Sequence, residues 1–251
     1  MSAATNLALA VIGGSGLYAL PGFELLETRD IATPYGSPSG PVRIGTLHGK
    51  TIAFLARHGE GHNLPPHRVN YRANVFALNT LAPSSVLAIN TTGGITPACP
   101  PRALVLPDQI IDYTHGRDAS FWDGAGNMLH AEFGEPYSAR LRTALLEAGR
   151  KANVELVDGA TYGATQGPRF ETRAEIARMR RDGCDLVGMT GMPEAALARE
   201  LGMDYACLSP VANWAAGAGD GMPIELEEVF ANLTAANAKL PPLLEALLAG
   251  G

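Results

Sequence analysis

The sequence predicts an α/β fold in a single domain, because short apolar runs alternate with amphipathic helical segments along its 251 residues. A hydrophobic content of 46% and a charged content of 18% exclude a disordered chain. Glycine and proline residues separate the apolar runs, which is typical of a globular fold rich in loops. We therefore expect one domain over residues 1–251, built on a mostly parallel sheet flanked by helices.

Apolar runs of four to six residues, each bounded by turn formers, predict buried strands. These runs are residues 7–12, 51–56, 85–90, 103–106, 185–189 and 203–208. Helical periodicity predicts helices over residues 71–81, 138–147, 172–181, 193–201 and 224–240. Thr172 and Glu175 form a capping box, and Gly149, Gly183 and Gly202 are expected to follow three of the helix ends. Pro241 and Pro242 are expected to break the last helix.

Charge and cysteine usage exclude several classes of protein. The net charge is −6 without a long basic tract, so neither a nucleic-acid partner nor an anionic membrane surface is expected. Cys99, Cys184 and Cys207 are odd in number and far apart, which predicts buried reduced thiols. No charged signal segment and no apolar run near 18 residues are found, so we expect a cytoplasmic protein with no membrane span.

The glycine-rich turn at residues 13–16 follows the first predicted strand. Glycine permits positive φ, so several backbone N–H groups can converge on an anion, and Ser15 adds a hydroxyl. Residues 14–19 also match the dinucleotide pattern G-x-G-x-x-A. That pattern requires a helix directly after the turn, which Pro21 and Gly22 disfavour. A bare tight turn is the third interpretation.

Arg57 and His58 follow the second predicted strand, where open α/β sheets place ligands. The guanidinium group of Arg57 can hold two phosphate oxygens in a planar fork, and His58 can donate as well. A zinc site at His58, His62 and His67 is an alternative. However, the glycines and prolines of this segment disfavour the helix that would align the imidazoles of His58 and His62. A third interpretation is that these are loop histidines without a ligand.

Three more polar stretches lie near strand ends. Asn90 and Thr91 begin a glycine-rich exit, Thr190 lies between a strand and a helix, and Asn213 follows the last predicted strand. Phe170 and Glu171 are adjacent in an irregular segment, suited to stacking on a flat heterocycle and accepting its N–H. The simpler interpretation is that Phe170 packs on the following helix and Glu171 favours its N-terminal dipole. Together the stretches indicate a site for an anion, a sugar and a heterocycle.

The segments IGGSGLY, ARHGEGH, PHRVNYRAN, DQIIDYT, SFWDG, TQGPRFET and MTGMPEAALARELG span most of residues 7–225. In these the chain resembles the trimeric purine nucleoside phosphorylase family, most closely its 5′-methylthio-nucleoside branch. The resemblance implies a three-layer αβα sandwich with a twisted mixed sheet, assembled as a homotrimer. It also implies phosphorolysis of a nucleoside, with inorganic phosphate as co-substrate and no metal or other cofactor.

The resemblance also implies roles for individual residues. The phosphate-binding set is Ser15, Arg57, His58, Asn90, Thr91 and Thr190, and the expected catalytic residues are His58, Glu171 and Asn213. Met189 lies beside the ribose and Phe170 stacks on the base. His130 matches a family histidine that reaches into the 5′ pocket of a neighbouring subunit.

Base and sugar preference can be predicted from departures within the family. Adenine-selective members carry an aspartate in place of Asn213 and a small residue in place of Glu171. Here Glu171 can accept N1–H of a 6-oxopurine while Asn213 donates to O6. No histidine follows His130, and Ile224 and Leu226 offer an apolar wall for a methylthio group.

The predicted substrate is therefore S-methyl-5′-thioinosine, cleaved to hypoxanthine and 5-methylthioribose 1-phosphate in purine salvage. The alternatives are S-methyl-5′-thioadenosine phosphorylase, an inosine or guanosine phosphorylase, and a nucleosidase that uses water. From a different class, a dinucleotide-binding oxidoreductase also remains.

Overall fold

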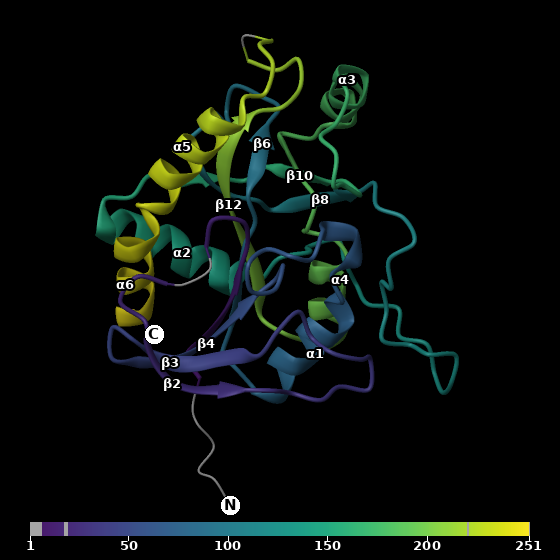
Figure 1. Cartoon of the computed structure of the whole chain (residues 1–251), viewed down its shortest axis with the longest axis vertical. Helices are drawn as coiled ribbons and strands as arrows, with labels where there is room; N and C mark the ends of the chain where they lie inside the picture. Colours follow the sequence, from purple (N-terminus) through teal and green to yellow (C-terminus); the bar gives the residue numbers. More distant parts are fainter. Residues whose placement is uncertain (1–6, 18–19, 220, 251) are drawn as a thin grey trace, which may run out of the picture.

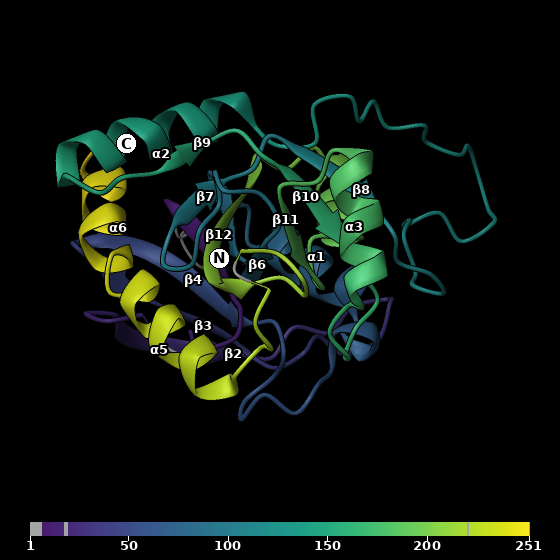
Figure 2. The same cartoon turned by 90° about the horizontal axis from the view of Figure 1, so that it is seen from above.

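The computed structural model describes residues 7–17, 20–219 and 221–250. Its helices are α1 (Tyr71–Thr80), α2 (Ala139–Ala152), α3 (Arg173–Asp182), α4 (Glu194–Glu200), α5 (Leu226–Asn237) and α6 (Leu240–Ala249), with a 3-10 turn at Pro66–Arg68. Figures 1 and 2 show α2, α5 and α6 on one face of a twisted sheet and α1, α3 and α4 on the other. The expected three-layer αβα arrangement is confirmed.

The sheet follows the order β2-β3-β4-β1-β5-β12-β6-β11-β10-β8, and β7 pairs with both β12 and β9. The strands are β1 (Leu9–Gly13), β2 (Glu24–Arg29), β3 (Val42–Leu47), β4 (Lys50–Ala56), β5 (Val86–Ile89), β6 (Thr92–Gly94), β7 (Leu104–Leu106), β8 (Gln109–Asp112), β9 (Val157–Asp158), β10 (Thr161–Ala164), β11 (Leu186–Gly188) and β12 (Tyr205–Trp214). All six predicted strands are found, and β12 continues well beyond its predicted end at residue 208.

The sheet is more mixed than the sequence patterns predict. Strands β4, β1, β5 and β12 are mutually parallel, but β2, β3 and β4 form an antiparallel meander. His48 and Gly49 connect β3 to β4 with φ angles of 48° and 74°. Two residues with positive φ form a tight hairpin turn, which can join only antiparallel strands.

The core lies on both faces of the sheet. In β1, Ala10 and Ile12 pack with the buried side chains of α1 and α4, while Leu9 and Val11 pack with those of α2 and α6. Burial on both faces explains why this strand is a continuous apolar run without alternation. All three cysteines are buried and unpaired, as predicted. None of the described helices is long and apolar enough to cross a bilayer.

Most predicted helices are confirmed, and two predicted ends are wrong. The capping box of α3 is present, and Gly183 follows this helix with φ 95°. Helix α2 continues through Gly149 and ends at Asn153, which adopts the left-handed conformation itself. Pro241 and Pro242 do not end a helix but lie in the first turn of α6. Backbone N–H groups in a first turn have no partner within the helix, so the N–H that proline lacks is not needed there.

Two sets of strands bring their carboxyl ends together. Strands β1, β4 and β5 run in one direction, and the second half of β12 extends past β5 to pair with β6. Strand β11 is antiparallel to β6, so its last residue, Gly188, lies beside the first residues of β6. Strand β6 itself begins shortly after the end of β5. Strand β10 is parallel to β11 and ends beside it. Loops from both halves of the sheet therefore meet at one place.

Candidate active site

A cavity of about 670 Å³ lies where these strand ends converge. Most of the residues singled out in the sequence line it, namely Ser15, Arg57, His58, Thr91, Phe170, Glu171, Met189, Thr190, Asn213 and Leu226. They come from segments far apart in the sequence: the ends of β1, β4, β5, β10, β11 and β12, and helix α5. The size suits a drug-sized ligand held between polar and apolar walls.

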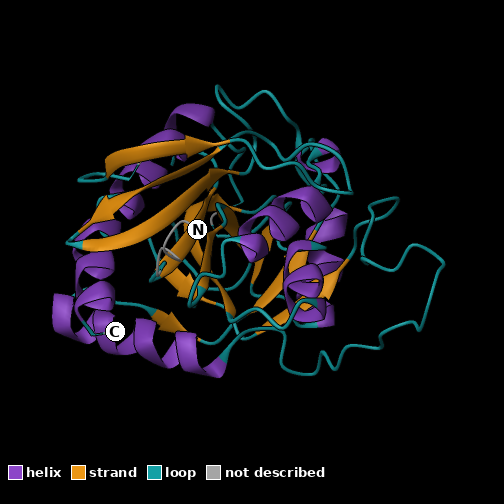
Figure 3. Cartoon of the chain, turned by 90° about the horizontal axis from the view of Figure 1, so that it is seen from below, coloured by secondary structure: helices purple, strands orange, loops and turns teal. Residues whose placement is uncertain are grey.

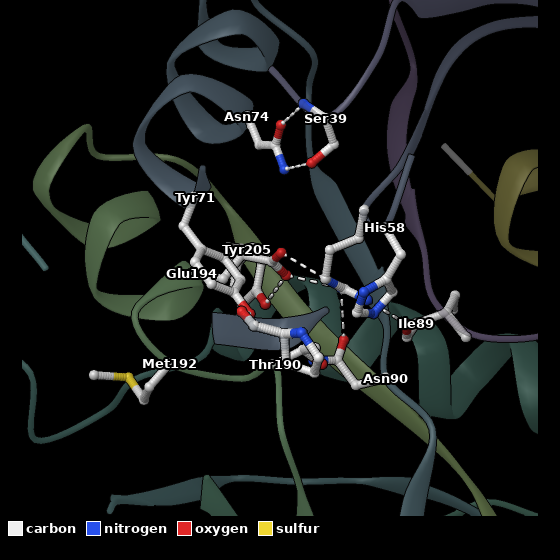
Figure 4. A network of polar contacts seen from close by, with 12 residues as sticks. Ser39, His58, Tyr71, Asn74, Ile89, Asn90, Thr190, Met192, Glu194 and Tyr205 are labelled. Atoms are coloured by element: carbon white, nitrogen blue, oxygen red, sulfur yellow. Dashed lines mark hydrogen bonds and ion pairs between the residues drawn. The ribbon is translucent and has the colours of Figure 1, made fainter. Parts of the chain in front are cut away.

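Arg57 is completely buried among polar partners, of which Figure 4 labels Ile89, Asn90 and Glu194. Its Nε and Nη2 atoms donate to the two carboxylate oxygens of Glu194 at 2.7 and 2.9 Å, and Glu194 is also 0% exposed. The hydroxyl of Tyr205 donates to Glu194 Oε1 at 2.9 Å. Burial alone would lower the pKa of Arg57, but the Glu194 carboxylate holds it above its ordinary value.

The predicted two-oxygen clamp by Arg57 on phosphate is therefore wrong, because Glu194 occupies that edge of the guanidinium group. The remaining Nη2 hydrogen goes to Asn90 Oδ1 at 2.9 Å and one Nη1 hydrogen to Ile89 O at 3.0 Å. Of the five N–H donors of Arg57, one on Nη1 is left for a ligand.

Asn90 is 0% exposed and is not among the residues that line the cavity, so its direct contact with phosphate stays a prediction. It supports the cavity from behind, because its Nδ2 donates to Thr190 Oγ1 at 3.0 Å. The Thr190 oxygen accepts this bond and keeps its own proton to donate. Arg57 and Thr190 both line the cavity, so the network holds in place two side chains that can donate to a ligand.

The glycine turn after β1 forms the adjoining wall. Thr91 Oγ1 donates to Ser15 O at 3.2 Å, which fixes the turn against the end of β5. A Cβ on Gly14 would lie 2.5 Å from Ile89 O and 3.1 Å from Arg57 Nη1, so only glycine fits there. A dinucleotide site requires a helix directly after this turn, and among the described residues there is none before β2. Tyr18 and Ala19 of that pattern lie outside the described residues.

His58 is 5% exposed, and its Nδ1 lies 2.8 Å from Leu64 O. A carbonyl only accepts, so Nδ1 carries the hydrogen and Nε2 is the unprotonated nitrogen of the neutral ring. Burial and the adjacent Arg57 lower the pKa of His58 to about 4. The His62 ring lies 4.5 Å away between centroids. Within residues 7–17, 20–219 and 221–250, no three His, Cys, Asp or Glu side chains converge as metal ligands.

Phe170 and Glu171 line the opposite wall. Phe170 is 46% exposed and lines the cavity, and the capping carboxylate of α3 is Glu175. The simpler interpretation of this pair is therefore not supported. Glu171 Oε1 accepts a hydrogen bond from Thr165 Oγ1 at 2.7 Å. Burial raises the pKa of Glu171, and the Thr165 bond acts against that rise.

Asn213 and Met189 complete this end of the cavity. Asn213 Nδ2 donates to Trp214 O at 2.7 Å, which leaves one amide N–H and Oδ1 for a ligand. A Cβ on Gly167 would lie 2.5 Å from Met189 Sδ, so the loop after β10 lies directly against this side chain. Contacts with neighbouring loop and strand residues thus hold the side chains of Asn213 and Met189 in place.

Helix α5 supplies an apolar wall at the cavity mouth. The wall consists of Leu226, Val229, Phe230 and Leu233 of α5 and of Ile224, which lies just before the helix. Leu226 and Phe230 are 58% and 64% exposed, although both are large and apolar. Exposed apolar groups of this kind mark a ligand or partner surface.

His130 does not line the cavity of its own chain. It lies in the long segment between β8 and α2, which contains no helix or strand and projects from the body in Figures 1 and 3. Trp122, Met128 and Leu129 in this segment are exposed apolar side chains. The structure of one chain therefore separates His130 from the other site candidates.

Sequence reasoning missed several residues that organise the site. Glu194 was visible only as part of a helix start, and nothing marked its pairing with Arg57. The apolar spacing i, i+3, i+4 and i+7 at Leu226, Val229, Phe230 and Leu233 could have indicated the face of α5. Arg117 was also missed, because its contacts are distant in sequence.

Arg117 joins three cavity loops at the base of the projecting segment. Its Nη2 donates to Thr165 O at 3.1 Å and to Gln166 O at 2.9 Å. Its Nη1 donates to the Tyr71 hydroxyl at 3.2 Å and to Met192 O. The Tyr71 hydroxyl in turn lies 3.0 Å from Pro66 O, in the loop after β4.

Curated relatives match nearly the whole chain. A probable S-methyl-5′-thioinosine phosphorylase from Xanthomonas campestris pv. campestris is 58% identical over 246 residues, which cover 98% of each chain. A protein with the same name from Xylella fastidiosa is 58% identical over 240 residues, 95% of this chain and 97% of that protein. A purine nucleoside phosphorylase from Streptomyces coelicolor is 44% identical over 88% of this chain and 81% of its own length.

Solved structures agree with the fold. Methylthioadenosine phosphorylase from Schistosoma mansoni superposes with a TM-score of 0.92 at 30% identity, covering 97% of this chain and 91% of that one. A methylthioadenosine phosphorylase from an antarctic soil metagenomic library gives 0.89 at 35% identity, covering 98% and 86%. The sequence pattern of the phosphorylase superfamily matches residues 8–249. With its strand ends, cavity and relatives in agreement, this chain belongs to the phosphorylase superfamily.

Proposed function

We propose that this protein catalyses the phosphorolysis of S-methyl-5′-thioinosine to hypoxanthine and 5-methylthioribose 1-phosphate. Curated relatives of that name, 58% identical over nearly the full length, support the reaction. The observation that carries the choice of substrate is one cavity lined by Glu171, Asn213 and the apolar wall of α5. These groups suit a 6-oxopurine at one end and a methylthio group at the other.

The reaction breaks the bond between C1′ and N9, and the bonding electrons leave with the purine. A phosphate oxygen then bonds to C1′. Positive charge on the sugar and negative charge on the base develop together, so donors and anions placed in advance lower the barrier. Binding both substrates in one cavity also removes the entropy cost of their encounter. No protein nucleophile is required.

Phosphate binds at the polar end of the cavity. Its donors are the Thr190 hydroxyl, the Ser15 hydroxyl, the turn amides after β1 and the remaining N–H of Arg57. Thr91 braces this turn from the end of β5. His58 presents an unprotonated Nε2, which accepts a hydrogen bond from a protonated phosphate oxygen or from water.

The purine lies against Phe170 between Glu171 and Asn213. Glu171 accepts N1–H and the Asn213 amide donates to O6. As the base leaves, its N7 takes up a proton from solvent, and Asn213 Oδ1 accepts a hydrogen bond from the resulting N7–H. Adenine would present a lone pair at N1 to the Glu171 carboxylate, and such a buried mismatch rejects a substrate strongly. Met189 lies beside the ribose.

The active form is a homotrimer that works in the cytoplasm. The projecting segment with Trp122, Met128 and Leu129 covers apolar surface of a neighbouring copy and delivers His130 to its 5′ pocket. Light scattering should give about three times the chain mass of 26.3 kDa. A monomeric mass in a fully active preparation would refute this assembly.

The deciding experiment compares methylthioinosine, methylthioadenosine and inosine, each with and without phosphate. We expect turnover to require phosphate and kcat/KM to be highest for methylthioinosine. A clear preference for methylthioadenosine would show that the roles of Glu171 and Asn213 are wrong. Turnover independent of phosphate would indicate a nucleosidase, and a rise in Tm with NAD would favour the dinucleotide alternative.

A further inference from the structure

Thr165 follows β10 and is 7% exposed, beside the carboxylate that faces the base. Its Oγ1 lies 2.7 Å from Glu171 Oε1 and 3.3 Å from Gly188 O. The Gly188 carbonyl already accepts the backbone N–H of Thr165 at 2.8 Å. The hydroxyl has one hydrogen, and the shorter contact to a carboxylate is the stronger of the two choices. The hydrogen is therefore directed to Glu171.

The position of this hydroxyl is fixed from both sides of its residue. The Thr165 N–H is bonded to Gly188 O, and the Thr165 carbonyl accepts from Arg117 Nη2 at 3.1 Å. A β-branched side chain on a fixed backbone has few rotamers. The hydroxyl is thus held toward Glu171 before any substrate arrives.

We propose that Thr165 is a specificity-determining residue, which keeps Glu171 in the form that only accepts hydrogen bonds. The inference rests on the proposed function, since it concerns the choice between 6-oxopurines and 6-aminopurines. An ionised carboxylate accepts N1–H of hypoxanthine, whereas a protonated carboxyl group would donate to N1 of adenine. By donating to Oε1, Thr165 stabilises the ionised form and leaves Oε2 for the base.

The surroundings of Glu171 make this bond consequential. Burial raises the pKa of Glu171, and the bond from Thr165 is the largest effect that lowers it. Two cavities border Glu171, namely the candidate site and a second cavity of about 600 Å³ that Thr165 also lines. The titratable and charged groups that line them are Asp112, Tyr113, His115, Arg169, Glu175, Arg178, Arg57, His58 and His62. Of these, Glu175 raises the pKa of Glu171 and Arg169 lowers it. Arg169 is itself paired with Glu175.

The test compares Thr165→Val, Thr165→Ser and wild type with methylthioinosine and methylthioadenosine between about pH 5 and pH 8. For Thr165→Val we expect kcat/KM for methylthioinosine near neutral pH to fall about tenfold. We also expect the ratio of methylthioadenosine to methylthioinosine turnover to rise. As pH is lowered, this rise should begin at a higher pH in Thr165→Val than in wild type. The ratio cancels groups that affect both substrates equally, such as His58. Thr165→Ser keeps the hydroxyl and should retain the wild-type ratio.

A matched control is Thr96→Val. Thr96 Oγ1 also donates to a carboxylate, Asp185 Oδ1 at 3.0 Å, but neither residue lines the cavity. This variant should keep the wild-type substrate ratio at every pH. If Thr165→Val does not fold, Thr165→Ala removes the same hydroxyl with less bulk. Carbon-detected NMR titration of Glu171 should show a higher pKa in either variant than in wild type.

An unchanged substrate ratio and an unchanged pKa of Glu171 in a folded variant lacking the hydroxyl would overturn the proposal. That result would leave the proposed function intact, because wild type would still prefer methylthioinosine. A wild-type enzyme that prefers methylthioadenosine would instead refute the function itself.

Discussion

Arg57 Nε lies 2.7 Å from Glu194 Oε2, and neither side chain is exposed to solvent. The pair is electrically neutral, so Arg57 brings no net positive charge to the cavity beside it. It anchors Asn90, which in turn bonds to Thr190, and one of its own N–H groups is left for a ligand. The proposed phosphate end of this site is therefore organised by directed hydrogen bonds more than by a cluster of free cations.

Removing the charge of Glu194 should destabilise the protein strongly. Glu194→Gln leaves the Arg57 charge buried without a counter-charge, which costs about 3–5 kcal/mol of unfolding free energy. Urea unfolding measures this loss. Glu245→Gln, at an exposed position on α6, is the control and should be neutral. A Glu194→Gln protein as stable as wild type would show that the buried pair contributes no stability.

Thr190→Val should weaken phosphate binding selectively. The variant loses one aimed hydroxyl, so the KM for phosphate should rise about tenfold while the KM for the nucleoside changes less than about twofold. Initial rates with each substrate varied in turn measure both constants. Thr80→Val removes a hydroxyl that donates to Ala77 O at the end of α1, and it should change neither. An equal rise in both constants would argue against a phosphate contact.

Asn213→Asp should shift base preference toward 6-aminopurines. A carboxylate cannot donate to O6 but can accept from a 6-amino group, so the ratio of kcat/KM for methylthioadenosine to that for methylthioinosine should rise at least about tenfold. Glu171 still opposes adenine, so the switch should be incomplete. Unchanged selectivity would remove Asn213 from base recognition.

Leu226→Ala should reduce selectivity for the methylthio group without harming the fold. The side chain is 58% exposed, so unfolding free energy should change by less than about 0.5 kcal/mol. Lost apolar contact should lower the preference for methylthioinosine over inosine by about three- to tenfold. Competition between the two nucleosides in one assay gives this ratio directly. An unaltered ratio would place the methylthio group elsewhere.

Folding stability should decrease as pH falls through the range set by His58. Its pKa is about 4 in the folded protein against an ordinary 6.5, so the unfolded chain binds the proton more readily. The contribution is complete above about pH 6.5 and lost as pH falls toward about 4, amounting to about 3 kcal/mol. Unfolding free energies of wild type and His58→Asn should diverge over that range. Parallel pH profiles would contradict the buried neutral imidazole.

Local sequence patterns predicted six of the twelve described strands, most of the helices and many of the residues that line the cavity, but they missed strands such as β2 and β3. The capping box at Thr172 and Glu175 depends on contacts within one turn, and the buried strand at β1 depends on its own apolar run. The predicted break at Pro241 was wrong because proline is compatible with the start of a helix as well as with its end. The pattern alone does not distinguish the two.

The sequence by itself determined the fold class, the family and which polar residues would follow the strands. Only the tertiary structure decided how they act together. It turned the Arg57 fork onto Glu194, placed Asn90 behind Thr190, and aimed the hydroxyl of Thr165 at Glu171. Arg57 and Glu194 are 137 positions apart, and such partners are chosen by strand order and burial rather than by spacing along the chain.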